Sequence, residues 1–150
     1  MSSLVLVAGG GFLAAVLWFD LMFDVQALGS APSAETIASI MAYYRRVTTE
    51  AAPMGHLVAA VMATTLVAGV HDLTRAERQR PLRAMALLLA AAPIALALLR
   101  VLPNAVALGR EAAVGPEQIA LARSILRDHV LCLACIIGFL GARFGLAMRP

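Results

Sequence analysis

The chain has 150 residues, of which 61% are hydrophobic and only 14% are charged, and its formal net charge is +3. A soluble domain of this length leaves about a third of its unfolded surface exposed after folding, so it could not hide so large an apolar fraction from water. The basic residues are all arginine and are scattered between apolar stretches, without the contiguous basic face that a nucleic-acid site requires. The composition therefore predicts a membrane protein that is embedded in the lipid bilayer.

Four apolar stretches are each long enough for a helix to cross the hydrocarbon core of a bilayer. A spanning helix needs about 20 residues, and a backbone inside lipid must satisfy its own hydrogen bonds, which favours helices over strands. The stretches cover residues 4–23, 53–70, 84–102 and 129–147. We therefore expect an all-α fold, a four-helix transmembrane bundle built from a single integral membrane domain over residues 1–150.

The distribution of arginine predicts how this bundle is oriented. Loop 71–83 contains four arginines and two acidic residues, and the C-terminal tail contains two arginines and no acid. These arginines are Arg75, Arg78, Arg80, Arg83, Arg143 and Arg149. Because arginine-rich loops stay in the cytoplasm, we expect a multi-pass protein of a bacterial-type plasma membrane with both termini cytoplasmic.

The loop after the first stretch has the pattern of an amphipathic helix over residues 34–49. Ser33 is a suitable N-cap, and Glu35 suits the first helical turn. Apolar residues follow at i, i+3, i+4 and i+7, on one helical face. They are Ile37, Ile40, Met41 and Tyr44. We expect this helix to lie on the outer membrane surface or over the mouth of the bundle.

The remaining local signals concern helix ends and helix packing. Pro116 after Gly115 predicts a helix that starts there and runs unbroken into the fourth stretch. Pro93 should kink the third stretch, because proline removes one backbone hydrogen bond. Small residues such as Gly11, and the whole Gly9-Gly10-Gly11 run, predict close helix packing. Alternatively, these small-residue faces could pack against another subunit, in a homo-oligomer or a larger membrane complex.

Polar and ionisable residues gather at the external ends of all four stretches, whereas the cytoplasmic ends carry mostly arginine. The external group consists of Asp20, Asp24, Glu50, His56, Arg100, Asn104, Arg123, Arg127, Asp128 and His129. Asp20 and Arg100 are the deepest charges, so we expect them to form an ion pair with His129 or His56 beside it. The alternative is that these are helix-end groups reaching the lipid headgroups.

Cys132 and Cys135 form a C-x-x-C motif inside the fourth stretch, one turn after His129. Three interpretations remain open. The cysteines could help to bind a metal or haem together with His56 or Asp20, they could form a redox pair, or they could be small buried apolar side chains. The motif resembles that of quinone-coupled disulfide enzymes, which are also four-helix membrane bundles, but the second cysteine pair of those enzymes is absent here.

Two segments resemble the family of small four-helix membrane proteins named after anthrone oxygenase. They are the segment from Leu102-Pro103-Asn104 to Leu108 and the segment from Ala122-Arg123 to Asp128-His129. The resemblance implies that Asn104, Arg123, Arg127 and His129 are the important positions. It also implies either a cofactor-free oxygenase that acts on a flat aromatic molecule or a relative without known activity.

The sequence leaves two principal hypotheses for function and does not specify a cofactor. The first is a non-enzymatic subunit or partner of a membrane complex. The second is a membrane oxidoreductase or oxygenase that uses Asp20, Arg100, Asn104 and His129 on a lipophilic, aromatic or quinone-like substrate. An enzyme requires a pocket at the external ends with His129 facing into it, whereas a subunit predicts paired charges without a pocket. A carrier ranks last, because the centres of the second and third stretches contain no polar path.

Overall fold

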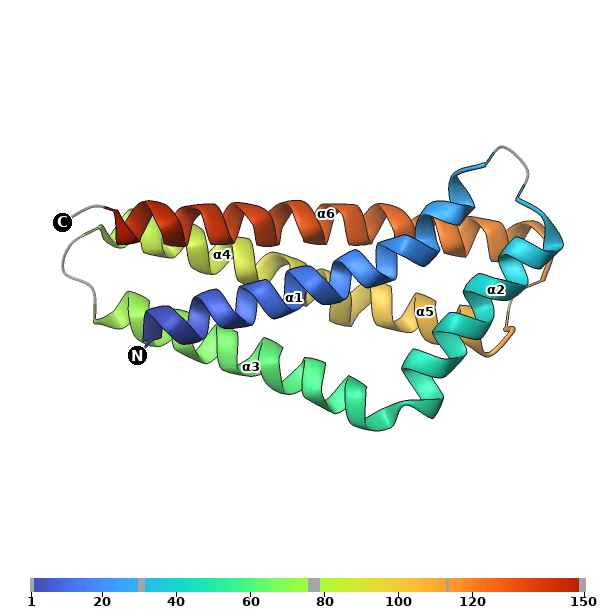
Figure 1. The fold of residues 1–150 in the computed structure, drawn as a ribbon, viewed down its shortest axis with the longest axis horizontal. Coiled ribbons are helices and arrows are strands. Elements are labelled where there is room, and N and C mark those ends of the chain that lie inside the picture. Colours follow the sequence, from blue (N-terminus) through green and yellow to red (C-terminus); the bar gives the residue numbers. More distant parts are fainter. Residues whose placement is uncertain (1, 30–31, 76–78, 113, 149–150) are drawn as a thin grey trace.

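The computed structural model describes residues 2–29, 32–75, 79–112 and 114–148 (Figure 1). Within these ranges all regular structure is helical, and no strand occurs. Arg78 and Arg149, two of the arginines used above to predict orientation, lie outside the described residues. The predicted all-α fold is therefore confirmed for the described chain.

The described residues form six α-helices, three of which continue into a short turn of another helix type. Helix α1 (Ser2–Asp24) continues as a 3₁₀ turn, η1 (Val25–Leu28). Helix α2 (Ala34–Arg45) continues as a π-helical turn, η2 (Arg46–Glu50), and α3 covers Ala52–Thr74. Helix α4 (Arg80–Leu96), the π-helical turn η3 (Ala97–Val101) and α5 (Leu102–Gly109) follow without a break. Helix α6 covers Pro116–Ala147, so the helix that begins at Pro116 does run unbroken into the fourth stretch.

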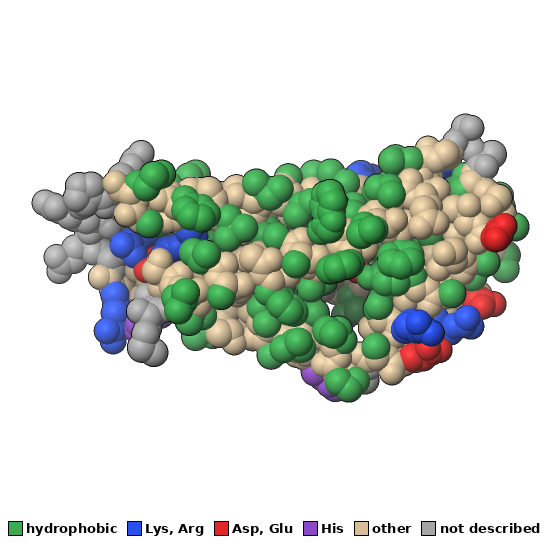
Figure 2. Space-filling view, viewed as in Figure 1, with side chains coloured by type: hydrophobic (Ala, Val, Ile, Leu, Met, Phe, Trp, Pro, Cys, Tyr) green, Lys and Arg blue, Asp and Glu red, His purple; other side chains and the backbone are tan. Residues whose placement is uncertain are grey.

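Four of these helical segments are long and apolar enough to cross a membrane, as the sequence predicted. They are Ser3–Leu28, Pro53–Thr74, Arg80–Gly109 and Pro116–Ala147. They run lengthwise beside one another, and α2 crosses one end of the bundle (Figure 1). We call this the α2 end, and the opposite end, where the described chain begins and finishes, the terminal end. Apolar side chains cover much of the length of the visible face, and charged side chains gather near its two ends (Figure 2).

Helix α1 packs closely against α3 and α6 through glycines. A Cβ atom at Gly9 would lie 2.2 Å from Oγ1 of Thr65, and one at Gly10 would lie 2.7 Å from Cε1 of Phe139. A Cβ atom at Gly11 would have no neighbour within 4 Å. The sequence therefore predicted packing in the right run, but it was wrong to choose Gly11. The contacts belong to Gly9 and Gly10, because the rotation of α1 about its axis points these two residues at the neighbouring helices.

Helix α2 lies over the mouth of the bundle, which is one of the two placements expected from the sequence. Its N-terminus is capped by Ser33, whose side chain accepts a hydrogen bond from the backbone N–H of Thr36 at 3.1 Å. Its apolar face is buried in a cluster with residues of η1, α5 and α6. The helix is shorter than predicted, because the chain changes to the π-helical turn at Arg46.

Pro93 lies inside α4, and the helix widens into η3 four residues later. Proline has no backbone N–H, so it interrupts the regular ladder of hydrogen bonds. The backbone N–H of Leu102 bonds to the carbonyl of Ala97 across five residues, as in a π-helix. The chain then resumes as α5, which brings Ala105 and Leu108 beneath α2.

Candidate functional site

The α2 end of the bundle contains a buried cluster of ionisable side chains from three helices. Asp20 and Asp24 are one turn apart on α1, His129 lies on α6, and Tyr43 and Tyr44 are neighbours on α2. We call these five residues the His129 site. The two aspartates share one helical face, as their i, i+4 spacing predicted.

His129 is buried, and the two aspartates contact its two ring nitrogens. Nδ1 lies 2.6 Å from Oδ2 of Asp24, which is a hydrogen bond between fully buried partners. Nε2 lies 3.7 Å from Oδ2 of Asp20, which is an ion-pair distance rather than a hydrogen bond. When Nδ1 donates its hydrogen to Asp24, Nε2 is left with a lone pair directed at the side of the ring where Asp20 lies.

The two tyrosines fix the other carboxylate oxygen of each aspartate. The hydroxyl of Tyr44 donates to Oδ1 of Asp24, and that of Tyr43 donates to Oδ1 of Asp20, each at 2.5 Å. The ring of Tyr43 is also stacked on Phe23, with ring centroids 4.0 Å apart. Burial, followed by the charge of the bonded aspartate, raises the pKa of both Tyr43 and Tyr44 well above 10.0. Both hydroxyls therefore keep their hydrogen at neutral pH and act as donors.

A cavity of about 540 Å³ lies beside this site, between α1, α3 and α4 and beneath α2. Its polar lining is confined to the α2 end and consists of Asp20, Tyr43, Tyr44, Thr48 and His129. The rest of the lining is almost entirely apolar and includes Phe12, Val58 and Ile94. A cavity of this size and polarity suits a small lipophilic molecule with one polar group. Asp24 does not line the cavity and lies behind the imidazole.

The predicted ion pair between Asp20 and Arg100 is wrong. Arg100 pairs with Asp128, with its Nε 3.3 Å from Oδ2, and Arg127 approaches the same carboxylate at 3.4 Å. Asp20 is instead turned toward His129, which is the neighbour that the sequence did suggest. Depth along a helix could be estimated from the sequence, but the direction in which each side chain points around its helix could not.

Of the other predicted site residues, only Cys132 reaches the cavity. Cys132 lines it and donates a weak hydrogen bond from Sγ to the carbonyl of Pro93 at 3.6 Å. Cys135 is half-buried outside the cavity lining, and both thiols are free. His56 is exposed and Asn104 is half-buried, and neither lines the cavity. Across the described ranges, no group of three or more His, Cys, Asp or Glu side chains is arranged to hold a metal ion.

The resemblance also singles out two arginines, Arg123 and Arg127. Neither of them lines the cavity. Arg123 donates to the backbone carbonyls of Ala27 and Gly29, at 3.2 and 2.7 Å, and so ties η1 to α6. Arg127 lies beside Asp128, as described above. Of the four positions that the resemblance singles out, His129 is therefore the one that lines the cavity.

Tyr43 and Tyr44 are the site residues that the sequence did not identify. Tyr44 was assigned to the apolar face of α2, and Tyr43 was given no role. They are the only two tyrosines of the chain and are adjacent. Their hydroxyls could have been matched to the two aspartates, because a buried carboxylate needs donors. The sequence predicted a position over the bundle mouth only as one of two placements of α2, however, and did not indicate that its tyrosines face α1.

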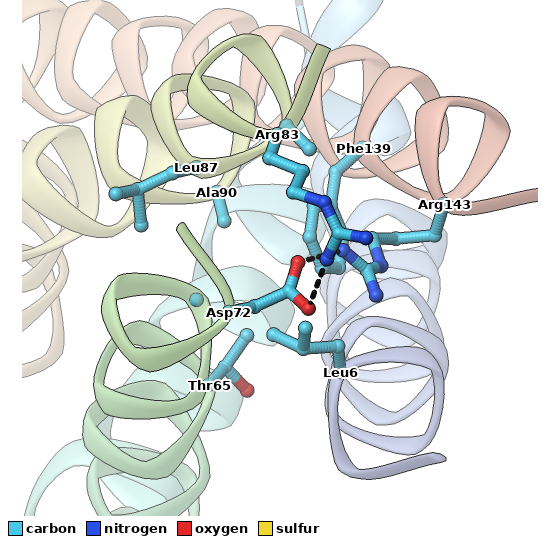
Figure 3. Close-up of a pocket in the computed structure, with 10 residues that line it drawn as sticks. Leu6, Thr65, Asp72, Arg83, Leu87, Ala90, Phe139 and Arg143 are labelled. Atoms are coloured by element: carbon cyan, nitrogen blue, oxygen red, sulfur yellow. Dashed lines mark hydrogen bonds and ion pairs between the residues drawn. The ribbon is translucent and has the colours of Figure 1, made fainter. Parts of the chain in front are cut away.

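A second charged cluster, formed by Asp72, Arg83 and Arg143, lies near the terminal end and joins three helices. Oδ1 of Asp72 accepts from Arg83 of α4 at 2.5 Å, and Oδ2 accepts from Arg143 of α6 at 2.6 Å (Figure 3). The side chain of Arg143 is 5% exposed, and that of Arg83 is 28% exposed. The space beside this Asp72 cluster measures only about 10 Å³, about the volume that one water needs. The geometry of the Asp72 cluster is that of a structural link between helices.

Comparison of the chain with models of protein families, with curated proteins and with solved structures gives no match. The geometry of the His129 site and its cavity is therefore the basis for a function.

Proposed function

We propose that the chain is an integral membrane protein whose four apolar segments span a bacterial-type plasma membrane. The support is their length, their apolar composition and the concentration of charge near the two ends of the bundle. Arg75, Arg80 and Arg83, at the facing ends of α3 and α4, lie at the terminal end together with Arg143. The positive-inside rule then favours a cytoplasmic terminal end and places the His129 site near the opposite membrane face.

We further propose that the His129 site binds a lipophilic aromatic or quinone-like molecule and removes a proton from it. The observation that carries this proposal is the cavity, which joins a buried imidazole held between two carboxylates to an otherwise apolar chamber. Buried ionisable groups inside a membrane protein are costly and tend to mark functional sites. A subunit that needed only paired charges would not require a chamber beside them, so the cavity favours the enzyme hypothesis.

The geometry assigns a distinct part to each residue of this reaction. Asp24 holds the hydrogen on Nδ1 of His129 and so leaves the Nε2 lone pair free to accept a proton from the substrate. Asp20 faces the same nitrogen and stabilises the imidazolium that forms. Tyr43 and Tyr44 keep the two carboxylates in place. The substrate anion is electron-rich, and dioxygen is the oxidant that the resemblance to the anthrone-oxygenase family implies for its further reaction.

The test is the oxidation of a hydroxyanthrone and of a short-chain quinol by the detergent-purified protein. Oxygen consumption and the visible spectrum of the product would be followed together. We expect His129→Ala to lower the rate by about 100-fold or more, the usual contribution of a general base. His56→Ala is the matched control, because His56 is exposed and lies outside the cavity lining. It should leave the rate unchanged.

Thermal unfolding of each variant would show that it is folded, so that a lost rate can be assigned to the missing base. Asp24→Asn should lower the rate as well, because the amide cannot hold the imidazolium as the carboxylate does. The proposal is overturned if neither substrate is oxidised faster than in detergent alone. It is also overturned if a folded His129→Ala variant is as fast as the original protein.

A further inference from the structure

The cavity beside His129 opens through the side of the bundle, between α1 and α3. Seven residues both line the cavity and are exposed. Five of them mark a mouth between α1 and α3, namely Ala15 and Phe19 of α1 and Met54, Gly55 and Ala59 of α3, and the other two are Leu98 and Leu102. None of them is polar. A hollow toward the α2 end is visible between the two helices, surrounded by apolar side chains (Figure 2).

This mouth lies on the part of the surface that the proposed membrane would cover. All five residues belong to segments long and apolar enough to span the bilayer. Helix α3 is the least buried of the four, and at its α2 end it stands away from α1 (Figure 1). Leu98 and Leu102 extend the apolar rim on the other side of α3, and both are exposed. A ligand that passes this rim comes from lipid.

The chemistry at the inner end restricts the polar group of such a ligand. Two carboxylates and one imidazole leave a surplus of acceptors and of negative charge, so the polar group must donate a hydrogen bond. A carboxylate or phosphate would be repelled by Asp20. A permanent cation would have to cross an entirely apolar mouth without a partner. A neutral hydroxyl group, such as that of a phenol or hydroquinol, satisfies both conditions.

We infer that the ligand is an amphiphile with a neutral hydroxyl-bearing head and an apolar tail, and that it enters from the bilayer between α1 and α3. The head lies beside Asp20 and His129, and the tail extends through the mouth into the lipid. The inference depends on the proposed function, because it describes the substrate of the same site. It adds the class of the molecule and the route by which the molecule arrives.

Cys132 provides a direct probe, because its thiol lines the cavity and does not depend on turnover. In a Cys135→Ala background reconstituted in vesicles, the rate at which N-ethylmaleimide modifies Cys132 would be measured with nonylphenol, phenol or decanoate present. At equal aqueous concentration we expect nonylphenol to slow the modification by about tenfold or more, because its tail concentrates it in the lipid at the mouth. Phenol and decanoate should each change the rate by less than about twofold, because one lacks the tail and the other has the wrong head.

Two glycines offer a matched pair for testing the route. Gly55 lies in the mouth and Gly141 lies on the exposed side of α6, and a Cβ atom at either would have no neighbour within 4 Å. Gly55→Phe should narrow the mouth and slow the onset of protection by nonylphenol about tenfold, a change in access rather than in affinity. Gly141→Phe adds the same ring to another helix and should leave the onset unchanged.

The possible outcomes separate this inference from the proposed function. Equal protection by phenol and nonylphenol, or an onset that Gly55→Phe does not change, would overturn the tail and the lateral route while leaving the His129 site in place. Equal protection by decanoate would overturn the neutral head. If no hydroxyl compound protects Cys132 and the oxidation assay is also negative, the inference and the proposed function fail together.

Discussion

Asp20 and Asp24 are residues of the same type, one helical turn apart, but they have different roles because their surroundings differ. Asp24 is fully buried and holds both His129 and Tyr44 through short hydrogen bonds. The side chain of Asp20 is 17% exposed, lines the cavity and reaches His129 only at ion-pair distance. At the residue scale, Asp24 therefore orients the imidazole, and Asp20 is the carboxylate that a ligand would meet.

The two tyrosines should make the protein sensitive to alkaline pH. Their pKa values are raised in the folded chain by burial and by the aspartates, so the unfolded chain releases these protons first. The stabilisation is therefore complete below about pH 10, the ordinary tyrosine pKa, and decreases as the pH rises toward the folded values. The chain contains no lysine, and these are its only tyrosines, so tyrosinate absorbance reports on this pair alone.

We expect no tyrosinate signal from the folded protein at about pH 10–11 and a signal that rises together with unfolding at higher pH. Replacing both residues by phenylalanine should flatten the alkaline loss of stability, while lowering stability at neutral pH because two aspartates lose their donors. An ordinary tyrosine titration near pH 10 in the folded protein would contradict the hydrogen bonds described here.

At the scale of elements, close contacts at single positions decide how the helices rotate and pack. Helix α1 approaches α6 at Gly10, where a side chain would meet the ring of Phe139, while the adjacent Gly11 faces open space. The sequence indicated a small-residue face on α1 but not which of three consecutive glycines lies in the contact. Which glycine lies in the contact depends on the side chains of the neighbouring helix, so it can be seen only in the packed bundle.

Gly10→Ala should destabilise the bundle, and Gly11→Ala is its matched control on the next residue of the same helix. The added Cβ at position 10 would overlap Phe139 and Leu140, and overpacking of this kind costs about 1–3 kcal/mol. At position 11 the added methyl group meets nothing, so stability should stay the same or increase slightly. Thermal unfolding in detergent measures both changes. Equal effects of the two substitutions would show that α1 is rotated differently from the structure.

The Asp72 cluster gives a second prediction at this scale, because it ties α3, α4 and α6 together. Asp72→Asn removes the only carboxylate in the cluster and leaves Arg143 buried without a charged partner, a change that typically costs about 3–5 kcal/mol. Arg83→Gln should cost less, because Arg83 is more exposed and Asp72 keeps its bond to Arg143.

The double variant Asp72→Asn with Arg143→Gln tests the same tie. It should recover part of the stability lost in Asp72→Asn, because it removes the uncompensated charge. Unfolding measurements on the three variants decide the matter, and a larger loss for Arg83→Gln than for Asp72→Asn would contradict this arrangement.

At the scale of the whole molecule, the two ends of the bundle carry different clusters of ionisable side chains. The terminal end carries Arg75, Arg80 and the Asp72 cluster, and the α2 end carries the His129 site and its cavity. Four antiparallel segments bring the first and last described residues to one end, so in the proposed membrane the side on which that end lies also decides which side the cavity is near (Figure 1).

Reporter fusions should place both termini in the cytoplasm. A fluorescent protein fused after residue 150 should be bright, and alkaline phosphatase inserted in the loop between Gly109 and Pro116 should be active, because arginine-rich loops are retained inside. The inverse pair of signals would reverse the orientation and place the His129 site near the cytoplasmic face.

The sequence by itself determined the class of the fold, the four apolar segments, the cap of α2 and the gathering of polar groups at one end of the bundle. These features follow from composition, helical period and position along each helix, which are local properties. Only the tertiary structure decided that Asp20 faces His129 rather than Arg100, that Tyr43 and Tyr44 hold the aspartates, and that a cavity lies beside them. The physical reason is that the rotation of each helix, and the space left between helices, depend on how all the side chains pack together.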